Sequence, residues 1–489
     1  MKIQYITPVY KKGDKSAPEN YRPISLTSHI IKIFERVIRK KMVEYLEENN
    51  ILNEAQHGFR KGRSCLSQLL EHYDFILNHL LHREEVDVIY LDYAKAFDKV
   101  DHTILLAKLR NIGIENNVYH WISDFLQNRQ QTVLVKDNCH NSKKSYYSTV
   151  KSGVVQGSVI GPLLFLIFIN DLSKGITETR LISFADDTKM VRNIRNAESV
   201  KSLQIHLNQI VHNSINENMT LHEGKFQLLS YRNKHQNQDL PFANEYLTYS
   251  TPNGIELKPE KQVRDLGIIM TDDARWSSHI AEMSENAKRM ASWVLGAFSS
   301  RDKTTMMTLY TTMVRSKMEF CCPLWDPVNI HDIEKLESIQ KTFTQKISGC
   351  QNLDYYARLK HLNLLSLQRR RERYTLIHTW KILHGNVPNP GLEFYDSGRT
   401  GIKIKFPKQP SGPMYAQTLH ERSFRVRATK LWNTVPKEIK MAPNLERLKI
   451  LIGKFLQNIP DEPPVPGYPR SWSNSIIHWH SQPGGQTSI

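Results

Sequence analysis

The sequence has little cysteine and no long apolar run. Its five cysteines form no CxxC pair and no Cys/His cluster with the spacing of a zinc site. The longest apolar stretch, Pro162–Ile169, is too short to span a bilayer, which needs about 20 residues. The first residues have no apolar segment typical of a signal peptide. We therefore expect an intracellular protein of a reducing compartment, without a transmembrane segment or a disulfide framework.

The composition is that of a folded, basic protein. Hydrophobic residues make up 40% and charged residues 24% of the 489 positions, which excludes wholesale disorder. This length predicts two or three domains. The chain carries 66 Lys and Arg against 49 Asp and Glu, a formal net charge of +17. This excess favours a polyanionic partner, above all nucleic acid, over a basic surface without a role.

The residue patterns change along the chain. Residues 1 to about 245 alternate between strand and helix patterns, and a strand pair follows up to about 275. From residue 278 to 385 the pattern is almost wholly helical, and beyond it lie loops, short strands and a small helical region. The last thirty residues hold six prolines and are predicted to be disordered. The predicted domains are residues 1–275, 276–385, 386–458 and a tail, 459–489.

Carboxylates stand at two unusual places. Asp92 directly follows the apolar strand predicted at Val86–Leu91, and Asp186 and Asp187 are adjacent at the tip of a predicted hairpin. A carboxylate at the end of a buried strand is costly unless it is paired or binds a metal. Divalent metal ions would neutralise all three groups, as in a two-metal nucleotidyl-transfer site. The alternatives are a strand-end cap for Asp92 and a solvated turn for the pair.

The sequences around these carboxylates resemble the catalytic motifs of reverse transcriptases. Residues 89–100 (IYLDYAKAFDKV) resemble the first catalytic motif, and residues 183–187 (SFADD) resemble the second. Between them, residues 153–158 (GVVQGS) and 170–172 (NDL) resemble the motif that supports the template and the incoming nucleotide. Residues 6–13, 20–26 and 56–64 (QHGFRKGRS) are similar to the fingers of non-LTR, LINE-type retrotransposon enzymes. Farther along, Arg425, Ala428, Leu431, Trp432, Asn433 and Pro436 resemble jockey-like elements.

The resemblance implies an α+β right-hand polymerase with an antiparallel palm sheet, reduced fingers and a helical thumb. It also implies an RNA-directed DNA polymerase that uses an RNA template, a DNA primer, dNTPs and two Mg²⁺ or Mn²⁺ ions. No endonuclease domain, Cys/His knuckle or RNase H carboxylate set is recognisable in the sequence. We therefore expect an N-terminally truncated reading frame.

The resemblance also assigns roles to individual residues. Asp92, Asp186 and Asp187, with the carbonyl of Tyr93, match the metal ligands, and Phe97 matches the gate that excludes a ribose 2′-hydroxyl. The residues implied in triphosphate binding are Lys11 or Lys12 and Arg22. Those implied along the template are Arg60, Lys61, Gln156 and Gly157. Leu266 and Gly267 resemble the primer-grip hairpin.

The segment around Lys225 departs from the family pattern. Lys225 stands where the family has a lysine that can protonate pyrophosphate, but His222 and Phe226 replace the usual Asn and Cys. In the helical part, the predicted contacts to a duplex backbone are Arg369, Arg370, Arg371 and Arg373, with a solvated helix face as the alternative.

Two other functions compete with reverse transcription. One is a catalytically decayed remnant that only binds nucleic acid, which the altered surroundings of Lys225 favour and the three intact aspartates oppose. The other is an RNA-dependent RNA polymerase, which Phe97 at the gate position opposes. The expected location is the nucleus and the cytoplasm, with no membrane partner.

Overall fold

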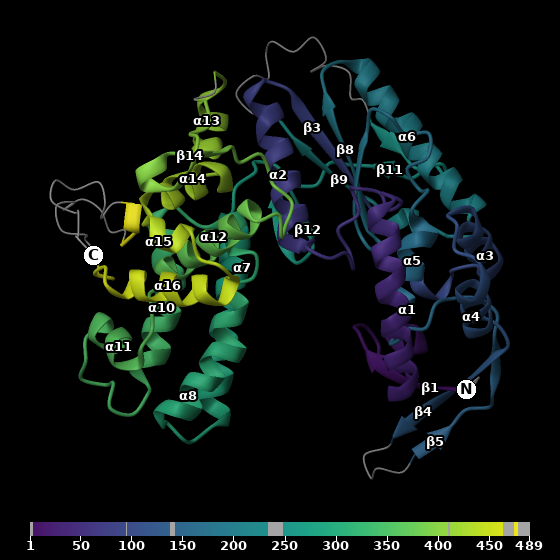
Figure 1. The fold of residues 1–489 in the computed structure, drawn as a ribbon, viewed down its shortest axis with the longest axis horizontal. Coiled ribbons are helices and arrows are strands. Elements are labelled where there is room, and N and C mark those ends of the chain that lie inside the picture. Colours follow the sequence, from purple (N-terminus) through teal and green to yellow (C-terminus); the bar gives the residue numbers. More distant parts are fainter. Residues whose placement is uncertain are drawn as a thin grey trace. The chain divides into compact units, whose positions relative to one another are not determined.

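The computed structural model describes residues 3–93, 95–136, 142–232, 248–408, 411–462 and 474–477 (Figure 1). By its internal contacts the chain divides into two compact units. The first consists of Met1–Lys61, Asp87–Leu228 and Gln238–Pro259, and the second of Gly62–Val86, Leu229–Asn237 and Glu260–Ile489. The boundaries predicted at residues 275, 385 and 458 differ from this division. The helical part and the region that follows it lie in one unit, together with residues 62–86.

A five-stranded sheet forms one part of the first unit. Its strands are β1 (Ile3–Tyr10), β2 (Tyr21–Leu26), β4 (Arg129–Lys136), β5 (Ser142–Lys144) and β6 (Ser148–Val150). The order is β2-β1-β4-β5, and β6 also pairs with β4. Strand β1 runs antiparallel to β2 and parallel to β4. The sheet therefore joins the N-terminal residues to a hairpin more than a hundred residues later.

A four-stranded sheet carries the candidate catalytic residues. It has the order β7 (Arg180–Phe184), β8 (Asp187–Ile194), β3 (Glu85–Leu91) and β9 (Gln227–Tyr231). Strands β7 and β8 form an antiparallel hairpin in which Phe184 pairs with Asp187. The predicted central strand and the predicted hairpin are both confirmed. A separate small pair consists of two strands of two residues each, β10 (Tyr249–Ser250) and β11 (Glu256–Leu257).

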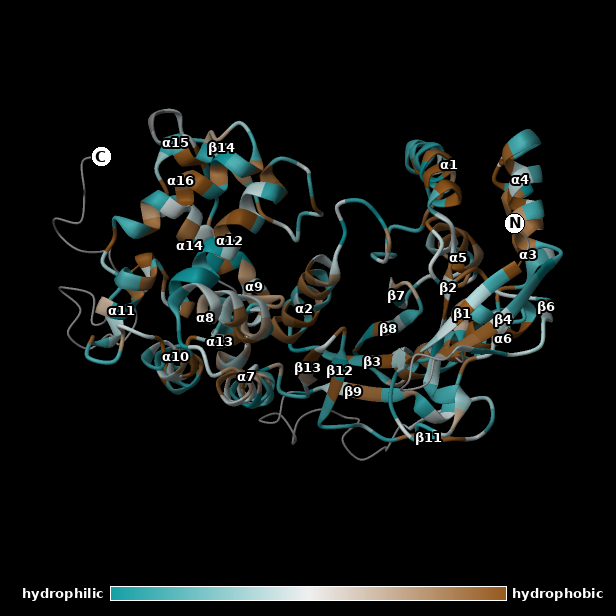
Figure 2. Ribbon diagram, turned by 90° about the horizontal axis from the view of Figure 1, so that it is seen from below, coloured by the Kyte–Doolittle hydropathy of each residue, from teal (hydrophilic) through white to brown (hydrophobic). Residues whose placement is uncertain are grey.

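The first unit also contains helices α1 (His29–Glu48), α3 (His102–Asn111), α4 (Asn116–Leu126), α5 (Gly161–Ile169) and α6 (Ala197–Asn216). Short 3₁₀ turns lie at Pro18–Asn20, Ala96–Asp98 and Glu223–Lys225. Helix α5 is the core element, because every residue in it except Pro162 is buried. It is apolar on all sides, as Figure 2 shows, since α3 and the rest of the core enclose it. The apolar run in the sequence is therefore a buried core helix.

The second unit is mainly helical. Its helices are α2 (Cys65–Leu81), α7 (Ser277–Ala297), α8 (Lys303–Leu309), α9 (Cys322–Trp325), α10 (Ile330–Gln345), α11 (Tyr355–Leu362), α12 (Leu367–Leu383), α13 (Met414–Glu421), α14 (Phe424–Thr434), α15 (Lys437–Lys440) and α16 (Leu445–Gln457), with a π-helical turn at Tyr310–Val314 and 3₁₀ turns at Arg315–Met318 and Gly398–Thr400. Two antiparallel hairpins belong to it, β12 (Gln262–Asp265) with β13 (Ile268–Thr271) and β14 (Phe394–Asp396) with β15 (Ile402–Ile404). Helix α12 is central, because α9, α10, α14 and α16 all pack against it.

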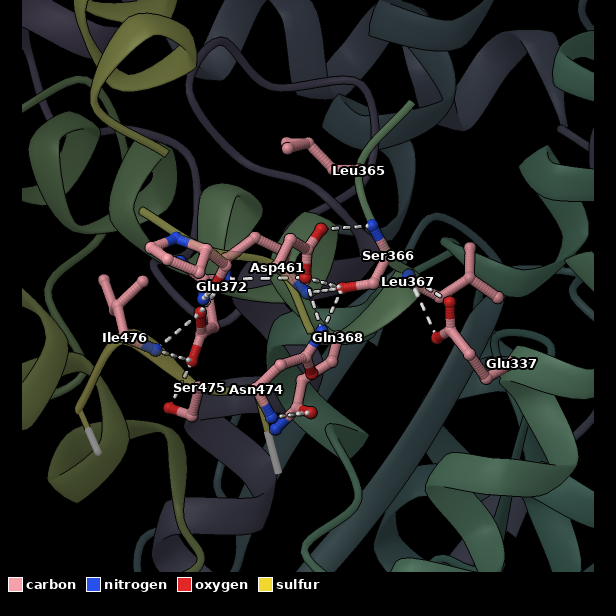
Figure 3. A network of polar contacts seen from close by, with 12 residues as sticks. Glu337, Leu365, Ser366, Leu367, Gln368, Glu372, Asp461, Asn474, Ser475 and Ile476 are labelled. Carbon is pink, nitrogen blue, oxygen red and sulfur yellow. Dashed lines mark hydrogen bonds and ion pairs between the residues drawn. The ribbon is translucent and has the colours of Figure 1, made fainter. Parts of the chain in front are cut away.

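Residues 459–462 and 474–477 of the C-terminal tail are ordered, which corrects the prediction of disorder for these positions within residues 459–489. Residues 463–473 and 478–489 lie outside the described residues. Residues 474–477 pack against the second unit, where Ile476 is fully buried. The Asn474 amide donates a hydrogen bond to the Ser366 hydroxyl over 2.8 Å, within the polar network drawn in Figure 3. Composition does not reveal this segment because its contacts come from distant residues.

Among the helices of the described ranges, none combines the length and the apolar character that crossing a bilayer requires.

Candidate active site

The first unit contains a large pocket, about 1300 Å³ in volume, at the end of strand β3. Asp92 follows the last residue of β3, and Asp186 and Asp187 lie at the turn between β7 and β8. All three aspartates line the pocket. The backbone of this region is fixed, because the carbonyl of Asp92 accepts a hydrogen bond from the amide of His222 over 2.8 Å. The fold thus brings together the carboxylates that the sequence singles out.

Charged side chains of the pocket influence the ionisation of Asp186. Burial, and then the negative charge of Asp92, raise the pKa of the Asp186 carboxyl, while the cations Lys11 and Arg22 lower it. Two carboxylates therefore converge where solvent is restricted, and two cations face them. A cation bound between the carboxylates, or an anionic ligand bound beside the cations, would stabilise such a site electrostatically.

The donor set of the pocket fits a hard divalent ion. Mg²⁺ is commonly held by one or two carboxylates and by substrate phosphate oxygens. The pocket supplies such carboxylates, although within the described residues no three His, Cys, Asp or Glu side chains gather into a ready-made metal cage. Burial raises the pKa of the Tyr93 hydroxyl, so this side chain stays neutral in the core. Only the backbone of Tyr93 is left to act as a ligand.

Lys225 reaches the pocket from the short helix Glu223–Lys225. Its ammonium group lies 2.7 Å from an Asp92 carboxylate oxygen, and both side chains are about half exposed. The lysine predicted from the family pattern is therefore next to the carboxylates, despite the altered neighbours His222 and Phe226. His222 itself lines the same pocket.

The opposite wall carries the predicted nucleotide-binding residues. Lys11 and Arg22, from β1–β2 and the turn between them, line the pocket together with Phe97. Lys12 is exposed and is not part of the lining, so the structure favours Lys11 of the two candidates. The ring of Phe97 stacks on Phe165 of α5 with centroids 4.4 Å apart, and it meets the ring of Phe59 edge-on. This packing holds Phe97 in one place at the pocket wall.

The loop at Gln156 and Gly157 closes another side. The Gln156 side-chain amide donates to the Asp98 carboxylate over 2.8 Å, and the backbone carbonyl of Gln156 accepts from the backbone amide of Ser25 over 2.7 Å. Gly157 has φ +112°, and a β-carbon there would lie 2.5 Å from the Ser25 carbonyl oxygen. Only glycine allows the backbone of this loop to approach β2 so closely.

Hydrogen bonds to the Gln56 side chain, which we call the Gln56 brace, fix the turn before the aspartate pair. Sequence reasoning does not reveal them. The buried Gln56 side chain accepts hydrogen bonds through Oε1 from the amide of Ala185, over 2.8 Å, and from the amide of Gly58, over 2.7 Å. Ala185 has φ +56°, a conformation that non-glycine residues rarely adopt. The amide of His57 also donates to the Ser183 carbonyl over 2.8 Å. The motif around Gln56 is recognisable in the sequence, but its role as a brace needs the structure.

Of the other predicted nucleic-acid contacts, the structure contradicts one, Arg60. Arg60 is almost fully buried, paired with Glu47 at 2.6 Å and bonded to the Asn53 carbonyl, so its assignment to the template path is corrected. Lys61 is exposed. Leu266 and Gly267, both with positive φ, form the two-residue turn between β12 and β13, as expected for a tight hairpin.

The arginine cluster of α12 is mostly internal, which corrects its assignment to a duplex backbone. Arg369 and Arg371 are essentially unexposed. Arg371 pairs with Asp326 at 2.5 Å, and Arg369 lies 3.7 Å from Glu372. Arg370 pairs with Glu319, and Arg373 is partly buried. Acids therefore lie beside Arg369, Arg370 and Arg371 inside the second unit, whereas Arg373 donates to the Lys449 carbonyl.

Comparisons with known proteins identify the family of this chain. Residues 9–270 match the family described as reverse transcriptase (RNA-dependent DNA polymerase). The chain is 24% identical over 359 residues to the probable RNA-directed DNA polymerase from transposon X-element of Drosophila melanogaster, a match that covers 72% of this chain and 38% of that protein. It is 25% identical over 342 residues to the RNA-directed DNA polymerase from mobile element jockey of Drosophila funebris, covering 68% and 36%. The chain thus spans well under half the length of these relatives.

Among solved structures, that of apo telomerase from Candida tropicalis is similar with a TM-score of 0.43 at 10% identity, covering 79% of this chain and 62% of that one.

Proposed function

The chain belongs to the reverse transcriptase family, and from this premise we propose that it is an RNA-directed DNA polymerase of the non-LTR retrotransposon type. The observation that carries the proposal is the convergence of Asp92, Asp186 and Asp187 with Lys11 and Arg22 in one pocket. In the proposed reaction the primer 3′-hydroxyl loses its proton to solvent and its oxygen bonds to the α-phosphorus of a dNTP. The bond from that phosphorus to the β-phosphate oxygen breaks, and pyrophosphate leaves.

The carboxylates hold the metal ions in this proposal. Asp92, Asp186 and Asp187, with the carbonyl of Tyr93, would bind two Mg²⁺ or Mn²⁺ ions. When bound, such ions lower the pKa of the primer hydroxyl and neutralise charge on the triphosphate. The raised pKa of Asp186 supports the assignment, because a bound cation would offset both the burial of this carboxylate and its repulsion by Asp92.

The remaining pocket residues bind and orient the substrates. Lys11 and Arg22 grip the triphosphate through charge-assisted hydrogen bonds. Lys225, 2.7 Å from Asp92, is placed to donate a proton to the leaving pyrophosphate. Phe97, held by Phe165, excludes a ribose 2′-hydroxyl and so selects dNTPs.

The loop at Gln156 and Gly157 supports the template and the new base pair, and Lys61 contacts the template strand. We also propose a location in the nucleus and the cytoplasm, where an RNA template, a DNA primer and dNTPs are available.

Primer extension on poly(rA)/oligo(dT) with Mg²⁺ tests the proposal. The wild type should extend the primer, and Asp186→Asn with Asp187→Asn, which changes charge with almost no change in volume, should not. Glu334→Gln with Glu438→Gln removes two exposed carboxylates of the second unit and should extend normally.

The second candidate function is nucleic-acid binding without synthesis, which the altered neighbours of Lys225 favour. Failure of the wild type to extend, with the template still retained, would select it.

A further inference from the structure

The second unit contains a basic pocket, about 400 Å³ in volume, that the polymerase reaction does not use. It is lined by the end of α2, by the chain that leaves β15, and by residues of α13 and α14. Its cationic groups are Lys405, Lys408 and Arg425, and the imidazoles of His82 and His420 also line it. Among the described residues Glu393 is the one carboxylate in the lining, and it pairs with Lys405 at 3.3 Å. The excess of cations indicates an anionic ligand.

The pocket is built by the motif at residues 423–433 (SFRVRATKLWN), which has no role at the candidate active site. Three of its polar side chains are structural. Arg427 pairs with Asp326 at 3.1 Å, and the Trp432 indole donates to the Ile402 carbonyl over 3.0 Å. The Asn433 amide bonds both the amide and the carbonyl of Ile404 over 2.9 Å. Asn433 thereby fixes the last residue of β15, directly before Lys405.

Arg425 differs from these side chains. Its Nη1 approaches the Asp74 carboxylate only to 3.5 Å, and within the described residues its buried Nε has no hydrogen-bond partner. The guanidinium lies over Gly391, where an added β-carbon would be 3.3 Å from Cζ and 3.5 Å from Nε and Nη2. A buried donor without a partner is costly, and the planar guanidinium matches a phosphate group. Arg425 is therefore the motif residue with capacity for a ligand.

An aromatic ring completes the pocket. Phe406 stands between Lys405 and Lys408 in the chain, lines the pocket and keeps 58% of its surface exposed. A stacking ring beside cations is the combination that binds single-stranded nucleic acid, because the cations contact phosphates while a base stacks on the ring. A duplex, whose bases are already stacked, gains nothing from the ring.

We propose that this pocket binds a single-stranded nucleic-acid segment, with a phosphate ester at Arg425, Lys405 and Lys408 and a base on Phe406. The identification of the ligand as nucleic acid rests on the proposed function. Binding in this pocket does not require polymerase activity. The shared chemistry is a phosphate ester, which either a nucleic-acid backbone or a free nucleotide offers.

The test measures binding of the full chain to a fluorescein-labelled 20-nucleotide single-stranded RNA over a range of salt concentrations. Lys405→Gln with Lys408→Gln, Arg425→Gln and Phe406→Ala should each weaken binding by roughly tenfold. The charge variants should also reduce the slope of log K against log salt by about 0.7 for each phosphate that the variant no longer neutralises, whereas Phe406→Ala should leave the slope unchanged.

Matched controls are available in the same unit. Lys430→Gln removes one charge from an exposed position of α14 outside the lining, and Tyr395→Ala removes an exposed ring of β14. Both should bind RNA as the wild type does. Equal losses in the pocket and control variants, or no loss in either, would overturn the proposal. The lysine variants do not touch Asp74, so they remain informative if Arg425→Gln unfolds, which thermal melting of each variant reports.

Two further arms separate the alternatives. A fluorescent nucleotide, N-methylanthraniloyl-ATP, should bind all variants alike, and a loss confined to this probe would overturn the backbone assignment. Repeating the RNA titration in the Asp186→Asn, Asp187→Asn background should preserve the tenfold effects. The pocket proposal therefore stands or fails separately from polymerase activity.

Discussion

Replacing Gly58 by alanine should displace the candidate catalytic aspartates without touching them. A β-carbon at this position would lie 2.3 Å from the amide nitrogen of Ala185 and 3.0 Å from its Cα. Favourable contacts between such atoms are found at about 3.5–4.0 Å, so the two segments must separate by roughly 1 Å or more. Ala185 directly precedes Asp186, and the nearest atoms belong to the backbone, which cannot rotate away.

The expected loss is large for one methyl group. A misplacement of about 1 Å at a reacting group costs on the order of 100-fold in rate. Overpacking a close contact also costs about 1–3 kcal/mol of the free energy of unfolding. Gly453→Ala is the matched control, because Gly453 lies within helix α16 with no neighbouring atom inside 4 Å of the added carbon. This control should stabilise the chain by about 0.5–1 kcal/mol and leave the rate unchanged.

The assay is single-turnover primer extension on poly(rA)/oligo(dT), together with urea unfolding of each variant. Gly58→Ala should lose extension rate while it still binds the template. A variant that extends at the wild-type rate, with stability equal to that of the control, would refute the argument that this contact sets the position of the Asp186 turn.

Three other predictions rest on the same structure. Phe97→Val should raise the incorporation of ribonucleotides by about tenfold or more, measured as alkali-sensitive product, and unchanged selectivity would contradict the gate. Gln56→Met should lower the free energy of unfolding by about 1–3 kcal/mol for each of the two amides left without an acceptor, measured by urea unfolding. Burial lowers the pKa of His279 to about 4, below the ordinary 6.5, so its contribution to stability is complete above pH 6.5 and is lost as the pH falls toward 4. Between pH 7 and pH 5 the free energy of unfolding, measured with urea, should therefore fall by about 2 kcal/mol more for the wild type than for His279→Gln. An equal fall in both proteins would contradict this prediction.

The candidate catalytic residues are predictable because their signals are local. Asp92 stands at the end of a buried strand, and Asp186 and Asp187 are neighbours at a hairpin tip, so a few residues of context are enough. The strands and most helices are predictable for the same reason. The brace is not, because Gln56 and Ala185 are 129 residues apart and nothing in either segment indicates the other.

The arginines of α12 show why charge alone is a poor guide to binding surfaces. Four arginines within five positions predict contacts to a duplex backbone or, as the alternative, a solvated face, yet Arg369 and Arg371 are buried beside carboxylates from other segments of the unit. Asp326 pairs with both Arg371 and Arg427, so these three charges do not cancel, but pairing still removes cations from the surface without reducing the net charge of +17. Other cations have no acid beside them among the interactions of the described residues. Lys11 and Arg22 in one pocket, and Lys408 in the other, are placed where that excess can meet phosphate.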